Sequence, residues 1–182
     1  MRSLIDRLTA ARIGRTTNFY RHGPGAALRR ERLAAYLEAR AGAPILVVGE
    51  APGYRGARVS GIPFTSERQL TGSGPAEATA TIVHRVLAEL GLAGQVLLWN
   101  VVPTHPGTAT SNRPPTPAEV RAGLPFAREL AEGRRIVAVG RIAASALGAA
   151  YVRHPSHGGA DAFREGLLPF APGGRLVRPF SV

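Results

Sequence analysis

Short, uninterrupted runs of apolar residues recur along the chain and predict buried β-strands. The three clearest runs cover residues 45–48, 96–99 and 136–139, and a weaker run covers residues 149–152. Runs of this kind, rich in branched side chains and without polar alternation, are typical of parallel strands that are buried on both faces. We therefore expect a buried sheet of four strands.

Segments with apolar residues at helical spacing separate these runs. Helices are expected over residues 1–15, 26–40, 76–90, 117–131, 142–147 and 160–168. In the second of these helices, Leu28, Leu33, Tyr36 and Leu37 would face the core.

The helix expected over residues 117–131 has a well-defined start. Thr116 and Glu119 form a capping box, and Pro117 takes the first helical position, where a backbone N–H is not needed. Strands that alternate with helices need crossover connections, which place helices on both faces of a parallel sheet. The pattern thus predicts an α/β fold.

Neither an internal repeat nor an interdomain linker interrupts this alternation. We expect a single domain over residues 1–182, with an N-terminal helical part over residues 1–40 and an α/β core over residues 44–170. The expected architecture is a three-layer α/β/α sandwich around a four-stranded parallel sheet.

Polar segments shaped by Gly and Pro follow the predicted strands. In parallel sheets of this type, ligands bind beyond the carboxyl ends of the strands. The segments at residues 49–64, 98–103 and 154–156 would therefore meet at one edge of the sheet and form one pocket.

The charge of the chain favours a polyanionic partner. The net charge is +11, and residues 1–40 hold nine Arg against three acidic residues, while residues 121–182 hold nine against four. Two basic ends that fold together would attract nucleic acid, the commonest polyanion. An alternative is that an arginine-rich composition reflects a GC-rich genome and no particular ligand.

Two residue types are absent and exclude certain chemistries. The chain has no Cys, which excludes disulfides, thiolate metal sites and cysteine nucleophiles. All 23 basic residues are Arg, so no Lys can form a Schiff base. No apolar run approaches the roughly 20 residues that span a bilayer, and we expect a cytoplasmic protein that does not enter membranes.

An ordered set of motifs resembles the uracil-DNA glycosylase superfamily over most of residues 44–166. The motifs are Gly-Glu-Ala-Pro-Gly at 49–53, Gly-Ile-Pro-Phe at 61–64, Leu-Trp-Asn-Val-Val-Pro at 98–103, Asn-Arg-Pro-Pro-Thr-Pro-Ala-Glu at 112–119, Val-Ala-Val-Gly-Arg-Ile-Ala at 137–143 and His-Pro-Ser at 154–156. The first motif is similar to that of a bacterial and archaeal branch of this superfamily.

This resemblance implies a DNA repair glycosylase that flips uracil, or a related deaminated base, out of DNA and hydrolyses its N-glycosidic bond. Asn100 would read the imide edge of the base, Phe64 would stack on it, and His154 would donate a hydrogen bond to the leaving base. Gly49 and Glu50 complete the implied base-binding set. The alternatives are an Asn that caps a turn, a core Phe and a structural His.

DNA phosphate would be bound next to this pocket. We expect Ser156, His157 and Gly158 to contact a phosphate through a loop that opens a helix, where backbone N–H groups suit an anion. Arg164, on that helix, is a further phosphate candidate or belongs to a solvated face.

The chain departs from the family pattern at two places in the site. Some branches have a water-activating Asp in the first motif, where Ala51 stands here. Glu50 is our candidate for handling the water, with Glu67 the other acid of that segment. The apolar wedge that usually follows His-Pro-Ser is also missing, and Phe163 is a candidate for that role.

The missing residue types also shape the expected reaction. The most similar branch carries a four-cysteine iron–sulfur cluster, which a chain without Cys cannot ligate, so we expect no metal and no cofactor. Without Lys, the enzyme should be monofunctional and leave an abasic site. We expect a monomer whose partner is DNA that contains uracil or another deaminated base.

Two other functions stay open. The same fold could act on hypoxanthine or xanthine, because such specificities differ by a few pocket residues. The chain could also be a damage-recognising DNA-binding module with little or no excision, since the first motif lacks its Asp. An unrelated nucleotide-binding protein is disfavoured, because no Gly-x-Gly-x-x-Gly motif is present.

Overall fold

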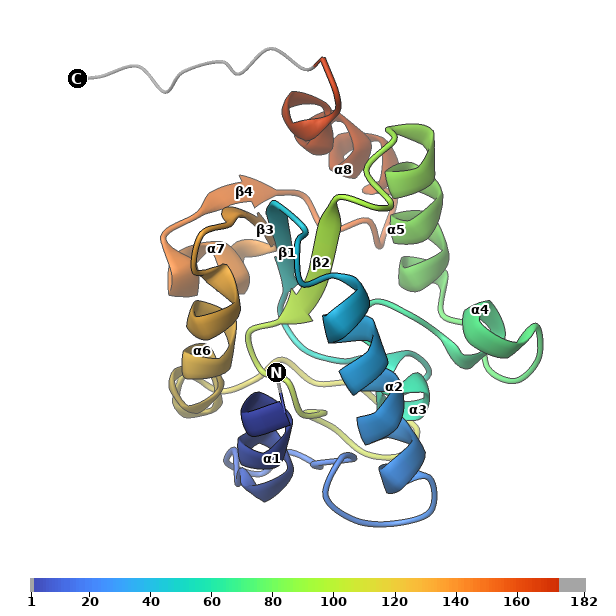
Figure 1. Cartoon of the computed structure of the whole chain (residues 1–182), viewed down its shortest axis with the longest axis vertical. Coiled ribbons are helices and arrows are strands. Elements are labelled where there is room, and N and C mark those ends of the chain that lie inside the picture. Colours follow the sequence, from blue (N-terminus) through green and yellow to red (C-terminus); the bar gives the residue numbers. More distant parts are fainter. Residues whose placement is uncertain (1, 174–182) are drawn as a thin grey trace.

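Four short parallel strands form the centre of the fold. The computed structural model describes residues 2–173 (Figure 1). The strands are β1 (Ile45–Gly49), β2 (Val96–Asn100), β3 (Arg135–Val139) and β4 (Ala150–Val152). They lie in the order β2-β1-β3-β4, and every pairing is parallel. The four-stranded parallel sheet expected from the apolar runs is therefore confirmed.

Eight α-helices and one 3₁₀ turn connect and flank these strands in the described residues. They are α1 (Arg2–Ala10), α2 (Ala26–Ala39), α3 (Ala57–Ser60), α4 (Glu67–Thr71), α5 (Ala78–Glu89), α6 (Pro117–Ala131), α7 (Arg141–Leu147), α8 (Ala160–Leu167) and η1 (Leu168–Phe170). Within residues 2–173, none of them has both the length and the apolar character that crossing a bilayer requires.

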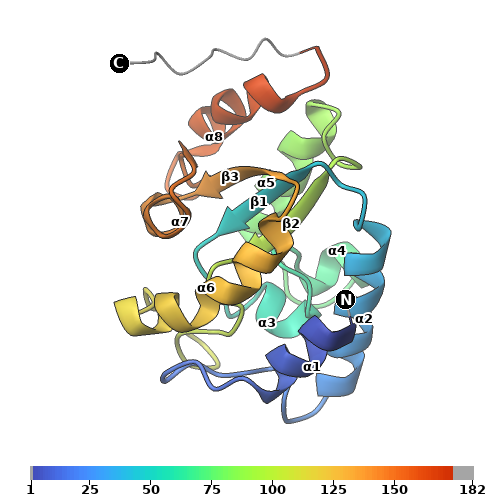
Figure 2. The ribbon, with the colours of Figure 1, turned by 60° about the vertical axis from the view of Figure 1, so that its left-hand side comes forward.

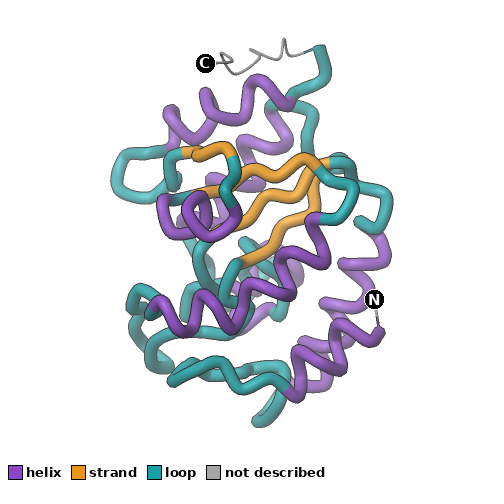
Figure 3. Tube along the Cα trace, turned by 90° about the vertical axis from the view of Figure 1, so that its left-hand side faces the viewer, coloured by secondary structure: helices purple, strands orange, loops and turns teal. Residues whose placement is uncertain are grey.

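The sheet lies between two helical layers, because successive side chains of each strand point to opposite faces. Leu46 and Val48 of β1 pack in one core cluster with residues of α1, α2, α6 and α7, whereas Ile45 and Val47 pack in another with α5 and α8. Figures 2 and 3 show the strands enclosed between these two layers. The three-layer α/β/α architecture is confirmed.

The capping box expected at the start of α6 is present. The Thr116 hydroxyl accepts a hydrogen bond from the Glu119 N–H, and the Glu119 carboxylate accepts one from the Thr116 N–H at 2.9 Å. These bonds satisfy backbone N–H groups that have no partner inside the helix.

The N-terminal helices differ from expectation in two respects. α1 ends at Ala10 and does not extend to residue 15, because the Asn18 side-chain amide donates to the carbonyl groups of Leu8 (2.7 Å) and Ala11 (3.1 Å). These carbonyl groups are the ones that a longer helix would use. The placement of Leu28 in the core is wrong, since 47% of it is exposed.

The two short helices α3 and α4 were not expected from the sequence, because their apolar residues form no helical period. The N-terminal part supports the segment that contains them. The Tyr20 hydroxyl donates to the Gly61 carbonyl at 2.8 Å, and the Arg29 guanidinium donates to the Val59 and Phe19 carbonyl groups at 3.2 and 2.9 Å. This segment therefore has a fixed position beside the sheet.

Candidate active site

A pocket of about 460 Å³ opens at the carboxyl ends of β1 and β2 and beside the loop after β4. All three segments that were expected to meet contribute to it, so their predicted proximity is confirmed. The lining residues are Glu50, Ala51, Pro52, Gly53, Ala57, Phe64, Glu77, Thr79, Asn100, Pro106, Asn112, Arg113, Pro114, His154, Ser156 and His157.

Phe64 forms an aromatic wall of this pocket over the end of β1. Its ring lies directly on Gly49, where any added Cβ would overlap the ring and come within 3.0 Å of the Asn100 Nδ2. Phe64 has φ +53°, a left-handed conformation that is strained for a bulky residue and that persists where the surrounding structure imposes it. Phe64 is 7% exposed, and it both packs in the core cluster of α5 and α8 and lines the pocket.

Asn100 is the last residue of β2 and presents an unused acceptor. It pairs with Gly49 in the parallel register and is 4% exposed. Its Oδ1 has no hydrogen-bond partner among the described residues. A buried acceptor without a partner costs about 1–3 kcal/mol, so this geometry suits a ligand that brings an N–H donor.

His154 lines the pocket from the loop after β4. Its Nδ1 accepts a hydrogen bond from the Ser156 backbone N–H at 3.2 Å, which assigns the ring proton to Nε2. Burial, and then the neighbouring His157 and Arg153, lower the pKa of His154. The ring can therefore donate from Nε2 at neutral pH without carrying a charge.

The loop after β4 makes a tight turn around His154. The Ser156 Oγ lies 2.7 Å from the His154 Nδ1 and 3.0 Å from the His157 Nδ1. His157 is exposed and has φ +52°. Gly159 has no room for a Cβ against the His154 carbonyl oxygen, so the turn requires Gly at this position.

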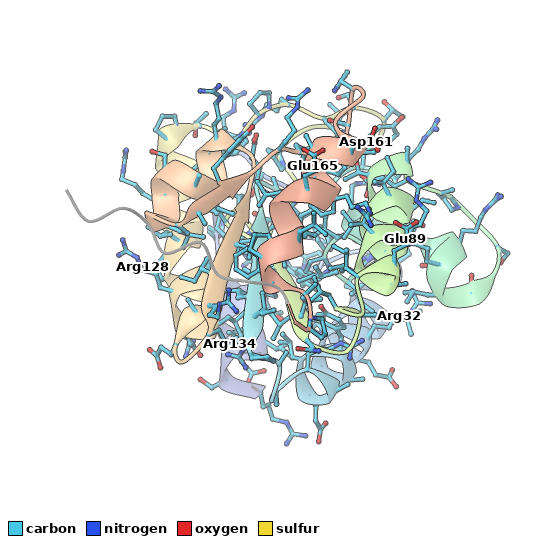
Figure 4. All side chains as sticks on the ribbon, turned by 90° about the horizontal axis from the view of Figure 1, so that it is seen from above. Arg32, Glu89, Arg128, Arg134, Asp161 and Glu165 are labelled. Atoms are coloured by element: carbon cyan, nitrogen blue, oxygen red, sulfur yellow. The ribbon has the colours of Figure 1, made fainter. Side chains whose placement is uncertain are left out.

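The other residues expected at DNA lie outside the pocket lining. Gly158 stands in the turn with φ +73°. The Arg164 Nε lies 3.6 Å from the Glu89 Oε2, which joins α8 to the neighbouring α5. Figure 4 shows these two helices side by side, with Glu89 on α5 and Asp161 on α8.

The suggestion that Phe163 wedges into DNA is wrong. Phe163 is fully buried in the core cluster shared by α5, α8 and the sheet. It occupies the apolar face of α8, so it cannot reach a bound duplex without unfolding the helix.

Two carboxylates line the pocket. Glu50, expected from the first motif, follows β1 directly, and burial raises the pKa of its carboxyl group. Glu77 was not expected. It precedes α5, and its carboxylate lies against the backbone of Gly53 and Gly56, where an added Cβ at either glycine would overlap it. Burial raises the pKa of Glu77 as well.

Glu67, the other acid of the first motif segment, does not reach the pocket. Its carboxylate pairs with the Arg32 guanidinium of α2 through two hydrogen bonds of 2.8 and 2.9 Å. Glu67 therefore fixes α4 to α2 and takes no part in the site.

The remaining wall of the pocket comes from residues 112–114, for which the family resemblance implied no role. The Asn112 side-chain oxygen accepts a hydrogen bond from the Tyr54 N–H at 2.9 Å. The Arg113 guanidinium binds the buried Glu119 carboxylate at 2.7 and 2.6 Å. These contacts hold the loop before α6 against the first motif.

A buried histidine supports the first motif from behind. His105 is fully buried, and its Nδ1 lies 2.8 Å from the Pro52 carbonyl oxygen, while its Nε2 lies 2.9 Å from the Thr108 carbonyl oxygen. Its only sequence signal is its place shortly after β2, which does not distinguish it from a loop residue.

Comparisons with known proteins identify the family and a similar fold. A family model described as "Uracil DNA glycosylase superfamily" matches residues 37–173. Among solved structures, the chain is similar to "The crystal structure of WT Pedobacter heparinus SMUG2", with a TM-score of 0.63 and 13% sequence identity over 90% of this chain and 93% of that chain. At this identity the likeness concerns the fold. A search of curated proteins gave no match.

Proposed function

The chain belongs to the uracil DNA glycosylase superfamily, and from this premise we propose that it excises uracil, or a related deaminated base, from DNA. The observation that carries the proposal is Asn100, whose buried Oδ1 has no hydrogen-bond partner among the described residues and which lines a pocket together with Phe64 and His154. The three groups together match a flat base with an N–H donor between carbonyl oxygens.

The pocket supports recognition of the flipped base. The Asn100 Oδ1 would accept the imide N–H of uracil, whereas cytosine has no donor at that atom and would leave the buried oxygen unpaired. The Phe64 ring would stack on the base from the end of β1. Extrusion from the duplex costs a few kcal/mol, which these contacts would offset.

The pocket also supports departure of the base. As the glycosidic bond breaks, the electron pair passes to the base and negative charge develops on its oxygens. A neutral His154, held by the Ser156 N–H, would donate from Nε2 to the developing anion, and this preorganised donor is the kind of group that stabilises such transition states. The absence of Lys supports a monofunctional enzyme that leaves an abasic site.

One assay tests this function. The protein would be incubated with single- and double-stranded oligonucleotides that carry uracil, hypoxanthine or xanthine, and abasic sites would be revealed by alkali. We expect strand scission at uracil, and only after alkali. Scission at hypoxanthine or xanthine alone would assign a different base, and no scission on any substrate would contradict the proposal.

Two substitutions test the assigned residues. Asn100→Ala and His154→Ala should each lower the single-turnover rate of excision by about 10²–10³-fold, since each removes a contact to the reacting base. Asn100→Ala should leave the melting temperature little changed, because the Oδ1 has no partner in the free protein. His22→Ala, in an exposed loop, is the matched control and should retain full activity. Wild-type rates in both site variants would refute the assignments.

A further inference from the structure

A carboxylate at the start of a helix commonly interacts with the free N–H groups of that helix, but the carboxylate of Glu77 does not. It is the N-cap residue of α5, and its side chain makes no capping hydrogen bond. The carboxylate instead reaches across to Gly53 and Gly56 of the first motif and lines the pocket. The two glycines leave the space that it fills.

This carboxylate has no ion-pair partner among the described residues, in a chain that carries 23 Arg. Glu67 is neutralised by Arg32 and Glu119 by Arg113, whereas Glu50, the other carboxylate of the pocket, has no ion pair among the described residues either. Burial without a compensating cation disfavours the charged form, which is the environment that brings a carboxylate toward the proton affinity of a general base.

Glu77 and Glu50 lie next to different parts of the first motif. Glu50 adjoins Gly49, which lies under Phe64 and Asn100, so it lines the pocket at the end of β1. Glu77 covers Gly53 and Gly56, further along the same loop and away from the stacking ring. Both carboxylates therefore line the pocket, and Glu77 does so at Gly53 and Gly56, where it could meet a water in the pocket.

We propose that Glu77 is the catalytic residue that orients and deprotonates the attacking water. The inference rests on the proposed function. In the step, the bond between sugar C1′ and the base nitrogen breaks with its electron pair going to the base. The water oxygen forms the new bond to C1′, and one water proton passes to the Glu77 carboxylate. The base anion takes up a proton from solvent and Glu77 releases its proton to solvent, so that one water is consumed in all. Glu77 thus takes the role of the acid that Ala51 replaces in the first motif.

The test is the single-turnover excision rate of Glu77→Gln on uracil-containing DNA as a function of pH. The amide keeps the shape and lacks the base, so we expect a rate at least about 10²-fold lower. Wild-type activity should fall as the pH drops through the pKa of Glu77, and this acidic limb should vanish in the variant. Affinity for uncleaved DNA should be kept or increased, because a negative charge is removed.

Matched variants separate the possible outcomes. Glu38→Gln, on an exposed position of α2, changes the net charge equally and should retain the wild-type rate. Gly53→Ala, which displaces the carboxylate without altering it, should also impair excision. If the wild-type protein excises the base and Glu77→Gln does so at the same rate, this inference alone is overturned. The same holds if Glu50→Gln loses activity and Glu77→Gln does not. No base release by the wild-type protein would overturn the proposed function and this inference with it.

Discussion

The hydrogen bond that His154 accepts at Nδ1 links its protonation to the shape of the loop that carries it. A protonated ring would have a donor at Nδ1, so the loop would lose the hydrogen bond from the Ser156 N–H and keep only the contact with the Ser156 Oγ, which can accept. Burial and the two neighbouring basic side chains act in the same direction and keep the ring neutral. The resting state of the site is therefore the state that donates from Nε2.

This residue should make stability depend on pH in a defined window. In the unfolded chain a His titrates near 6.5, and the fold lowers the pKa of His154. Between these two values the unfolded state binds more protons, so stability rises with pH through the window and falls as the pH drops. We predict that the wild-type melting temperature declines below about pH 6.5 more steeply than that of His154→Asn. Identical curves would contradict the prediction, since the buried His84 is common to both proteins.

At the scale of elements, Glu119 joins three segments at the start of α6. Its carboxylate is 2% exposed and accepts hydrogen bonds from the Arg113 guanidinium and from the backbone N–H groups of Thr116 and Arg15. The Arg113 hydrogen bonds are the main cause that lowers the pKa of Glu119 to about 2. One side chain thus connects the N-terminal part, the pocket wall and a core helix.

Substitution of Glu119 should reduce both stability and activity. Glu119→Ala leaves two backbone N–H groups without partners and removes the capping box, so we expect unfolding free energy to fall by more than about 2 kcal/mol. Urea denaturation measures this loss, and Glu132→Ala, at the other end of α6 and exposed, is the control. Excision should fall as well, because the wall at residues 112–114 loses its anchor. A stability loss no larger than that of the control would contradict this role.

The elements that the sequence predicted well are those with a local signal. The strand runs and the capping box at Thr116 depend on neighbouring residues alone, and the structure reproduces both. Leu28 was misplaced because a weakly amphipathic helix does not distinguish its core face by spacing. Phe163 was assigned to DNA from its place after the second motif, whereas the apolar period of α8 turns it inward.

Within the site, the residues with a local sequence signal were predicted, and the residue without such a signal was not. Asn100, Phe64 and His154 each end or follow a strand and carry a motif, so their meeting follows from the parallel sheet. Glu77 belongs to no motif and reaches the pocket from a loop before α5. Its contact with Gly53 and Gly56 arises only from tertiary packing, which neither spacing nor composition encodes.

Over the whole molecule, only some of the 23 arginines are free to bind DNA. Several arginines of the N-terminal part are occupied by the fold, such as Arg29 at backbone carbonyl groups and Arg32 at Glu67. Two arginines of the basic C-terminal stretch, Arg175 and Arg178, lie outside the described residues. Exposed arginines beside the pocket include Arg55 in the first motif loop and Arg153 before His154.

DNA binding should therefore depend on salt through a small number of arginines near the pocket. We predict that the affinity for an uncleaved duplex falls steeply with salt, with a slope of about 0.9 per phosphate contact in a double-logarithmic plot. Arg55→Ala or Arg153→Ala should each reduce this slope by about one. Arg128→Ala should leave it unchanged, because Arg128 points outward (Figure 4) from the last turn of α6, whereas the pocket wall at residues 112–114 precedes the first turn. Equal slopes in the wild type and the three variants would contradict this prediction, because they would mean that Arg55 and Arg153 do not contact DNA phosphates.

The hydrogen bonds from Tyr20 and Arg29 to the segment before Phe64 have a consequence for substrate entry. Because the buried Tyr20 holds the carbonyl group of Gly61 and Arg29 of α2 holds that of Val59, the aromatic wall cannot retract without breaking these contacts with the core. The cavity is thus rigid before any base arrives, and little conformational entropy remains to be lost on binding. The DNA must therefore change its shape during binding, by bending and opening so that the nucleotide enters a pocket of fixed shape.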